Sequence, residues 1–285
     1  MNLIKSLFVS GFTAVAWVAA ILSAQQLYAG EQALAWTGAL LAHAPFALMI
    51  GYWMLTRRTA RTTARLPWLM VLAISGVLMG GLGSLIGGGA MPVLVAMLGL
   101  AGVYGYVYWY SVLGRRPAAQ LAVGRRLPAL SLRHADGRSI NIHELIDRPS
   151  ILLFFRGNWC PLCMAQIREI AGHYQRIEKA GVRVALISPQ PHRNTESLAR
   201  KFKVNFDFLT DERNQAAIAL GIAAENGLPA GLQALGYDSD TVMPTVIITD
   251  AQAQVVWSDQ TDNYRVRPEP ESFLEVLTDR GLIST

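Results

Sequence analysis

The sequence predicts an α/β domain, with a mixed sheet flanked by helices, that follows four membrane-spanning helices. Three observations lead to this two-part architecture. The first 113 residues contain one acidic residue, Glu31, and four apolar segments of about 20 residues each, the length that crosses a bilayer as a helix. The remaining residues alternate short apolar runs with segments of helical periodicity, a pattern typical of a sheet covered by helices. The length of 285 residues allows two domains.

The apolar half is predicted to end near residue 113, so that residues 1–113 form the transmembrane domain. A linker rich in Gly, Pro and Arg follows at 114–126, and the second domain occupies 127–285. A cleaved signal peptide is the alternative for the first apolar segment, but that segment is longer than a typical signal-peptide core. We therefore expect it to be retained. The four predicted spans cover residues 8–27, 33–55, 67–86 and 90–113.

Arginines at the ends of the apolar segments predict the orientation of the spans. Two connections are basic, whereas the short connections at 29–32 and 87–89 contain no Lys or Arg. Basic connections favour the cytoplasmic side, so the chain is predicted to be a multi-pass protein of the inner (plasma) membrane with the second domain in the cytoplasm. The net charge of +5 reflects this topology and predicts contact with membrane lipid, not with nucleic acid. The basic connections contain Arg57, Arg58, Arg61 and Arg65, and then Arg115, Arg116, Arg125 and Arg126.

In the second domain, apolar runs bounded by turn residues predict a hairpin and then strands that alternate with helices. Asn194 and Asp211 are candidate caps for two of the helices. A loop over 223–239, with one helical turn, is expected to lie over the functional site. The expected hairpin joins 130–133 to 139–142, the expected strands cover 151–155, 182–187, 206–209, 245–249 and 255–258, and the last helix begins at 268–270 and extends to about 282.

The chemistry is concentrated in the Cys-Pro-Leu-Cys sequence between the first of these strands and a helix. Cys160 is expected at the start of that helix, where free N–H groups and the helix dipole favour a thiolate. Cys163 lies one turn further along the same helix face and can resolve a mixed disulfide formed at Cys160. The alternatives are two buried thiols or half of a zinc site. Zinc requires about four ligands, and a chain with two cysteines and no His pair at ligand spacing implies neither a metal nor a cofactor.

Residues 154–170, FFRGNWCPLCMAQIREI, resemble the peroxiredoxin-like branch of the alkyl hydroperoxide reductase and thiol-specific antioxidant family, within the thioredoxin-like superfamily. A second motif supports the resemblance, because Met243, Pro244 and Thr245 precede an apolar strand as the cis-proline loop does in that superfamily. The resemblance extends from about 127 to 282. It implies an α/β thioredoxin-like fold, a cis bond before Pro244, Met243 facing Cys160, and a substrate surface formed by these residues. Arg156, Trp159 and Pro161 beside the cysteines complete that predicted surface.

The chain departs from the family pattern at two positions. Peroxiredoxins have a threonine three residues before the reactive cysteine, where this chain has Gly157. They also have an arginine at the position of Pro244. Because those two groups position and polarise a peroxide, their absence favours disulfide exchange.

Three functional hypotheses therefore stand. The first is a membrane-anchored thiol-disulfide oxidoreductase in which Cys160 attacks and Cys163 resolves, with protein or small-molecule thiols and disulfides as partners. The second is a thiol-dependent peroxidase that reduces hydroperoxides through a sulfenic acid at Cys160. The third is a non-catalytic module that uses the same groove to hold a partner at the membrane.

Overall fold

A computed structural model describes residues 2–30 and 32–283 of the chain and divides it into two compact units. One unit consists mainly of residues 113–285, and the other of residues 4–57 and 62–112. The connection predicted at 29–32 includes residue 31, which lies outside the described residues.

The apolar unit contains four helices that are long and apolar enough to cross a bilayer, judged by length and composition. They confirm the four helical segments expected from the sequence. Large apolar side chains such as Leu55 and Leu85 are 87% and 86% exposed, which is consistent with a membrane protein. The helices are α1 (Asn2–Tyr28), α2 (Ala33–Thr56), α3 (Pro67–Gly83) with the π-helical turn η1 (Ser84–Gly88), and α4 (Met91–Gly105) with the π-helical turn η2 (Tyr106–Tyr110).

Close backbone contact between α2 and α3 depends on glycine. A Cβ atom at Gly38 would lie 2.4 Å from the carbonyl oxygen of Gly76, and one at Gly76 would lie 2.5 Å from that of Gly38. Small residues at such positions let apolar helices approach each other closely, which is the way helices associate where burial from water offers no driving force.

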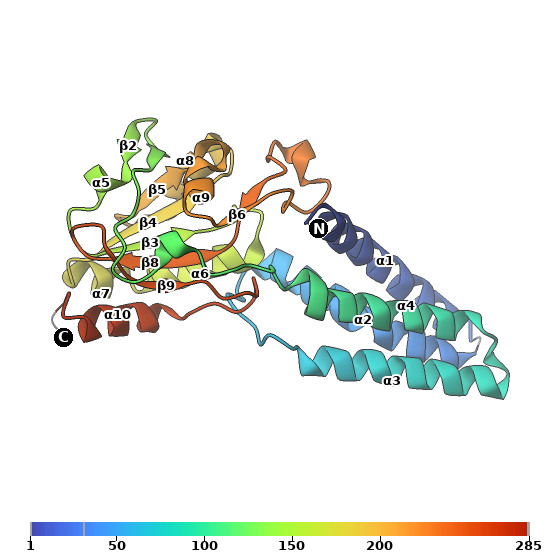
Figure 1. Cartoon of the computed structure of the whole chain (residues 1–285). Helices are drawn as coiled ribbons and strands as arrows, with labels where there is room; N and C mark the ends of the chain where they lie inside the picture. The colour runs from blue at the N-terminus through green and yellow to red at the C-terminus, as the bar shows by residue number, and fades with distance from the viewer. Residues whose placement is uncertain (1, 31, 284–285) are drawn as a thin grey trace. The chain divides into compact units, whose positions relative to one another are not determined.

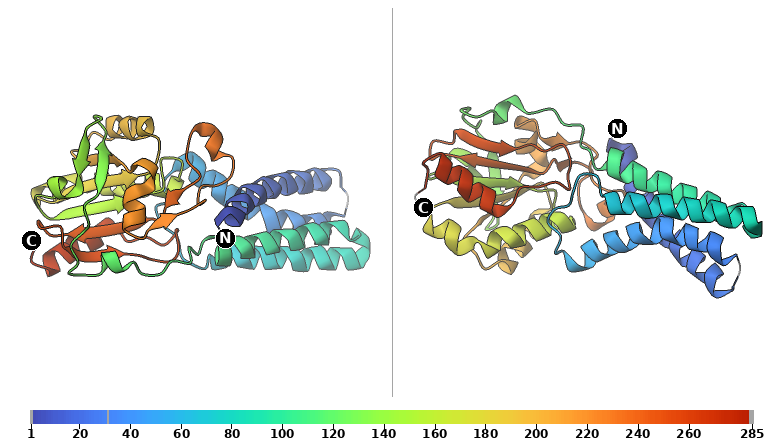
Figure 2. Two further views of the ribbon diagram at one scale, coloured as in Figure 1. Left: turned by 45° about the horizontal axis from the view of Figure 1, so that its top comes forward. Right: turned by 90° about the horizontal axis from the view of Figure 1, so that it is seen from below.

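The second unit is built on a seven-stranded mixed sheet with the strand order β2-β1-β5-β4-β3-β8-β9. The central strands β3, β4 and β5 are parallel, and the other pairings are antiparallel. Helices cover both faces (Figures 1 and 2). The strands are β1 (Ser131–His134), β2 (Ser139–Asn141), β3 (Ser150–Phe154), β4 (Arg183–Ser188), β5 (Asp207–Thr210), β8 (Thr245–Thr249) and β9 (Val255–Asp259), with β6 (Ala223–Ala224) and β7 (Thr241–Val242) in a separate small sheet. The helices are α5 (Ile142–Leu145), α6 (Pro161–Gly172), α7 (Tyr174–Lys179), α8 (His192–Lys201), α9 (Gln215–Ala219) and α10 (Pro270–Asp279), with short 3₁₀ turns η3 (Ala119–Leu121), η4 (Glu212–Asn214) and η5 (Leu232–Leu235).

The side chains of the central strands alternate between the two faces, and both faces are buried. On one face, Leu152 and its neighbours form a core with residues of α5 and α9. On the other face, Trp257 of β9 lies against Phe273 of α10, with ring centroids 6.3 Å apart. Parallel strands covered on both faces read as continuous apolar runs, which is the pattern that predicted them. The α/β thioredoxin-like fold expected from the sequence is confirmed.

The segment 114–126, predicted to be a linker, contains η3 and is tied to the edge strand β9. The side chain of Leu121 is 1% exposed and belongs to the core of the sheet. The Gly124 N–H donates to the Val255 carbonyl oxygen at 2.8 Å, and Arg126 forms a β-bridge with Gln254. This segment therefore packs as part of the second unit.

Two expected caps have different outcomes. The carboxylate of Asp211 accepts hydrogen bonds from the N–H groups of Ala216 and Ala217 at 2.8 and 2.9 Å, so the predicted cap at Asp211 is confirmed. The cap predicted at Asn194 is wrong, because α8 begins at His192 and its N-terminal cap is Pro191. The fixed φ of proline prepares the chain for a helix two residues earlier than the side chain of Asn194 suggested.

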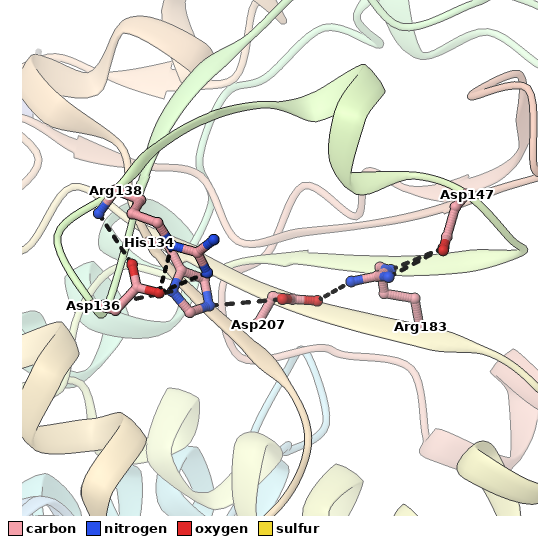
Figure 3. A network of polar contacts seen from close by, with 6 residues as sticks. All are labelled: His134, Asp136, Arg138, Asp147, Arg183 and Asp207. Atoms are coloured by element: carbon pink, nitrogen blue, oxygen red, sulfur yellow. Dashed lines mark hydrogen bonds and ion pairs between the residues drawn. The ribbon is translucent and has the colours of Figure 1, made fainter.

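A network of charged side chains lies at the edge of the sheet where β4 and β5 begin (Figure 3). Arg183 joins Asp207 at 2.9 Å and Asp147 at 3.1 Å, and His134 lies between Asp136 and Asp207. Cys160 follows the end of β3, which is parallel to β4. The charged network and the cysteines therefore lie at opposite ends of the central parallel strands.

Candidate active site

The turn from β3 into α6 places both cysteines at the N-terminus of a helix. Cys160 is the N-terminal cap of α6, and its Sγ accepts a hydrogen bond from the Cys163 N–H at 3.3 Å. Pro161 occupies the first helical turn, where a missing N–H costs nothing. Both cysteines are free thiols, and their side chains are almost fully buried, with Cys160 2% and Cys163 0% exposed. The sequence predicted this local geometry.

The loop that precedes Cys160 is held by contacts from three other segments, at Gln190, Thr241 and Tyr264. The Asn158 N–H donates to Gln190 Oε1 at 2.8 Å, and the Thr241 hydroxyl donates to the Arg156 carbonyl oxygen at 3.1 Å. The Arg156 guanidinium lies over the rings of Trp159 at 4.7 Å and Tyr264 at 5.5 Å. These cation–π contacts direct the positive charge of Arg156 toward the wall of the site.

The loop expected over 223–239 reaches this same turn. The Tyr237 hydroxyl donates to Asn158 Oδ1, and the Arg156 guanidinium donates to the Gly227 carbonyl oxygen. The loop therefore lies against the residues just before Cys160, at the place the sequence predicted.

A buried guanidinium that the sequence did not single out lies beside both thiols. Arg267 is 6% exposed, and its two terminal nitrogens are each 3.5 Å from Cys163 Sγ, with one of them 3.9 Å from Cys160 Sγ. The same side chain donates to Gln166 Oε1 at 2.9 Å and to the Tyr264 carbonyl oxygen at 3.0 Å. These two further contacts orient the planar guanidinium toward the sulfurs.

The two thiols share a hydrogen bond and titrate as a pair. Burial alone would raise the pKa of Cys163, but the hydrogen bond with Cys160 and the charge of Arg267 lower this pKa to about 5. Burial raises the pKa of Cys160 well above its ordinary value, and the hydrogen bond and charge of Cys163 raise it further. The reduced pair therefore holds one thiolate and one thiol near neutral pH.

This distribution of charge corrects one expectation. The sequence predicted the thiolate at Cys160, stabilised by the helix N-terminus and by Arg156. In the structure the Arg267 guanidinium lies closer to Cys163, and the resting thiolate is therefore favoured there. The Cys163 N–H, which donates to Cys160 Sγ, would stabilise a thiolate on Cys160 whenever the proton of the pair lies on Cys163.

The loop at Met243 to Thr245 lies near Arg267. Pro244 and Thr245 line a narrow cavity together with Gln166 and Arg267. The expected cis bond before Pro244 is wrong, because no cis peptide bond occurs among the described residues. The trans isomer is favoured even before proline. Both backbone polar groups of Met243 are satisfied with it, since its N–H donates to the Ile222 carbonyl oxygen and its carbonyl oxygen accepts from the Thr245 hydroxyl, each at 2.8 Å.

Of the other predicted site residues, Arg156, Trp159 and Pro161 adjoin the cysteines through the turn and the start of α6. No contact between Met243 and Cys160 is among the interactions of the described residues, so their expected apposition stays a prediction. Groups of three or more His, Cys, Asp or Glu side chains that could hold a metal ion do not occur in the described part of the chain.

Gly157 occupies a position that a threonine could not take in this structure. Its φ of +142° is in a region that L-residues with a side chain rarely adopt. A Cβ atom at Gly157 would lie 2.8 Å from two atoms of the Trp159 indole ring. A threonine at position 157 would therefore be strained in this structure and would meet the Trp159 ring, which occupies the space beside the turn.

Arg267 was missed because nothing in its local sequence marks it. It lies 104 residues after Cys163, in the irregular segment between β9 and α10. The sequence did suggest that Tyr264 and Arg265 could reach the site. Tyr264 does so, because its ring lies under the Arg156 guanidinium. Only the folded chain places the second arginine of that segment on the sulfurs.

A family model for the AhpC/TSA family matches residues 123–258. The match includes the Cys-Pro-Leu-Cys turn and the Met243 to Thr245 loop. Residues 123–258 form an AhpC/TSA family domain. This AhpC/TSA domain confirms the family resemblance expected from the sequence, and the domain belongs to the thioredoxin-like superfamily.

Curated relatives of the AhpC/TSA domain include peroxiredoxins and a disulfide oxidoreductase. Chloroplastic peroxiredoxin Q of Populus jackii is 27% identical over 114 residues, which cover 40% of this chain and 51% of that protein. Thiol-disulfide oxidoreductase ResA of Geobacillus thermodenitrificans is 28% identical over 131 residues, which cover 45% of this chain and 72% of ResA. The chain spans about half the length of the peroxiredoxin Q relatives that it matches.

Among solved structures, peroxidoxin BcpB of Mycobacterium tuberculosis aligns with 57% of this chain and 99% of its own, at 16% identity and a TM-score of 0.46. AhpC of Enterococcus faecalis aligns with 56% of this chain and 92% of its own, at 14% identity and a TM-score of 0.46.

Proposed function

We propose that the chain is a membrane-anchored thiol-disulfide oxidoreductase in which Cys160 attacks and Cys163 resolves. The observation that carries this proposal is the buried pair of free thiols with one guanidinium on both sulfurs. Cys160 is the sulfur at the N-terminus of the helix and the more exposed of the two. Two cysteines with a purely structural role would not explain a buried charge beside them, because burial of an arginine is unfavourable unless it is paired.

The proposed reaction exchanges two electrons in two steps. The proton of Cys160 passes to Cys163, and the Cys160 thiolate attacks one sulfur of a substrate disulfide, which breaks the substrate S–S bond and releases the first thiolate. Cys163 then loses that proton to the departing thiolate and attacks Cys160 Sγ. The mixed disulfide breaks, the second substrate sulfur leaves as a thiolate that takes a proton from water, and a Cys160–Cys163 disulfide remains. A thiol donor returns the pair to the reduced state by the reverse sequence.

A thiol-dependent peroxidase is the second candidate. It is favoured by the relatives named peroxiredoxin Q and by the cation beside the sulfurs. In this reaction Cys160 would attack a hydroperoxide, forming a sulfenic acid and an alcohol, and Cys163 would condense with the sulfenic acid to give the disulfide and water. The glycine at position 157 weighs against it, because no threonine hydroxyl can direct the peroxide there.

A comparison of two oxidants separates these candidates. The reduced full chain in detergent is mixed with oxidised glutathione or with hydrogen peroxide. With oxidised glutathione, we expect the Cys160–Cys163 disulfide to form about 100-fold faster than a free thiol reacts with the same disulfide. With hydrogen peroxide we expect a rate within about threefold of free cysteine, since no threonine hydroxyl at position 157 directs the peroxide. Mass spectrometry of alkylated samples measures both rates. Fast oxidation by peroxide alone would assign the chain to the peroxidases.

We further propose that residues 1–113 anchor the protein in the plasma membrane, that 114–126 connect to a redox domain at 127–285, and that this domain faces the cytoplasm. The four long apolar helices and the arginines at their ends support this arrangement. A reducing cytosol would keep the cysteines as thiols, so that the protein would act as a reductant.

The orientation can be measured with a membrane-impermeant maleimide. In intact cells that carry the protein we expect no labelling of Cys160 or Cys163, and labelling after the membrane is opened under reducing conditions. A reductant added before the label separates hidden thiols from oxidised ones. Labelling of intact, reduced cells at the rate of opened cells would place the cysteines on the outer side.

A further inference from the structure

Arg115 belongs to the segment that follows the last apolar helix in the sequence, and three hydrogen bonds tie this segment to the loop after β9. The Arg115 N–H donates to Asp262 Oδ1 at 2.7 Å, and the Leu113 N–H donates to the Asp262 carbonyl oxygen at 3.2 Å. The Ala118 N–H donates to Gln260 Oε1 at 2.7 Å. The backbone on both sides of Arg115 is therefore held in place.

From this position the Arg115 side chain reaches the loop at Met243 to Thr245. One terminal nitrogen donates to the Pro244 carbonyl oxygen, and the other donates to the Thr245 hydroxyl, both at 3.1 Å. The Thr245 hydroxyl donates in turn to the Met243 carbonyl oxygen at 2.8 Å. One guanidinium thus orients two carbonyl groups, one directly and one through a hydroxyl. Pro244 and Thr245 also line the cavity that contains Arg267.

Burial of the Arg115 guanidinium at this position is unfavourable, and the packing of this segment does not require it. Burial lowers the pKa of Arg115, and the charges of Asp259 and Asp262 offset this only in part. Its Nε is buried and has no hydrogen-bond partner among the described residues. An unsatisfied buried N–H is unfavourable, so an apolar residue would give a simpler contact between this segment and β8. The planar fork, which binds two acceptors at once, is the property that a lysine could not supply.

We propose that Arg115 is a positioning residue for the substrate-binding loop formed by Met243, Pro244 and Thr245. It holds the backbone of that loop at the wall of the cavity next to Arg267, and it thereby sets the affinity for the disulfide substrate without touching the sulfurs. This inference rests on the proposed disulfide exchange for its effect on activity, but not for its effect on the loop.

The test compares Arg115→Ala with Arg116→Ala in the full chain in detergent. Arg116 is the exposed neighbour, so this control removes the same charge without the contacts. With oxidised glutathione in single turnover, we expect Arg115→Ala to raise the half-saturating concentration about tenfold, because charge-assisted hydrogen bonds are lost. The maximal rate should change by less than about twofold. Arg115→Lys, which keeps the charge but not the fork, is expected to recover only part of the affinity.

A second readout needs no activity. Hydrogen exchange of the peptide that covers residues 241–246 is expected to become about tenfold faster in Arg115→Ala and to stay unchanged in Arg116→Ala. Thr245→Val, which removes the hydroxyl acceptor, should have a similar effect, and the double variant should add little to it. Unchanged exchange in both Arg115→Ala and Thr245→Val overturns the inference. If hydrogen exchange is faster in Arg115→Ala but the wild-type chain does not reduce disulfides, the loop contact is upheld and the proposed function is rejected.

Should Arg115→Ala not fold, Arg115→Lys and Thr245→Val answer the same question. An equal fall of affinity and maximal rate, or a loss of the low thiol pKa in Arg115→Ala, would contradict a role confined to the loop.

Discussion

Cys160→Ser is expected to reduce the rate of disulfide exchange by about 1000-fold or more, because serine is a poor nucleophile near neutral pH and the remaining thiol is buried. In this variant Cys163 keeps its contact with Arg267, which helps to lower the pKa of the thiol. Its side chain is 0% exposed, however, and no disulfide can reach it without opening the helix N-terminus. The measurement is the single-turnover reaction of the reduced full chain with oxidised glutathione, followed by mass spectrometry.

Cys163→Ser is the matched control for this prediction. It retains the attacking sulfur and loses the resolving one, so the mixed disulfide between Cys160 and glutathione should accumulate instead of the internal disulfide. The mass of the trapped adduct distinguishes the two variants. Retention of the full rate in Cys160→Ser, or an adduct on Cys163 in that variant, would reverse the assignment of the two roles.

Arg267→Gln is expected to shift the pH dependence of the reaction. In the wild-type chain the charge of Arg267 helps to lower the pKa of Cys163 to about 5, so that one thiolate of the pair exists throughout the neutral range. Without that charge, burial of the thiol should dominate and the pKa should rise by one unit or more. At pH 6 a rise of one unit should slow the reaction about twofold and a rise of two units about tenfold, in proportion to the smaller thiolate fraction.

The difference should disappear above about pH 9, where an ordinary thiol is ionised too. A thiolate of higher pKa is intrinsically more nucleophilic, so the variant could even exceed the wild-type rate there. The reduced pair also loses stabilisation, which should make its potential more negative by roughly 30 mV for each pKa unit. The ultraviolet absorbance of the thiolate against pH and equilibration with a glutathione buffer measure these two quantities.

Arg267→Lys and Arg168→Gln are the controls for the Arg267 prediction. The lysine keeps a charge near the sulfurs and should recover part of the shift, whereas Arg168 is exposed on α6 and its loss should leave the thiol pKa unchanged. Identical pH profiles for Arg267→Gln and the wild-type chain would remove the arginine from the mechanism.

The sequence by itself determined the features that depend on local patterns. Apolar length defined the four helices of the first unit, and the continuous apolar runs at 151–155 and 182–187 defined buried strands. The placement of Cys160 at the start of a helix followed from a short strand, a glycine turn and Pro161, all within a few residues. Such features depend on short-range sterics and hydrogen bonds, which the chain carries with it wherever it folds.

Tertiary structure alone decided the electrostatics of the site and the shape of its wall. Arg267 and Arg115 reach the thiols and the Pro244 loop from more than 100 residues away in sequence, and no periodicity or spacing announces them. The position of the thiolate followed, because it depends on the hydrogen bond between the two cysteines and on which sulfur lies nearer the guanidinium. The cis bond expected before Pro244 came from the family resemblance, and the folded chain has the trans bond, with the Met243 N–H donating to the distant Ile222 carbonyl oxygen.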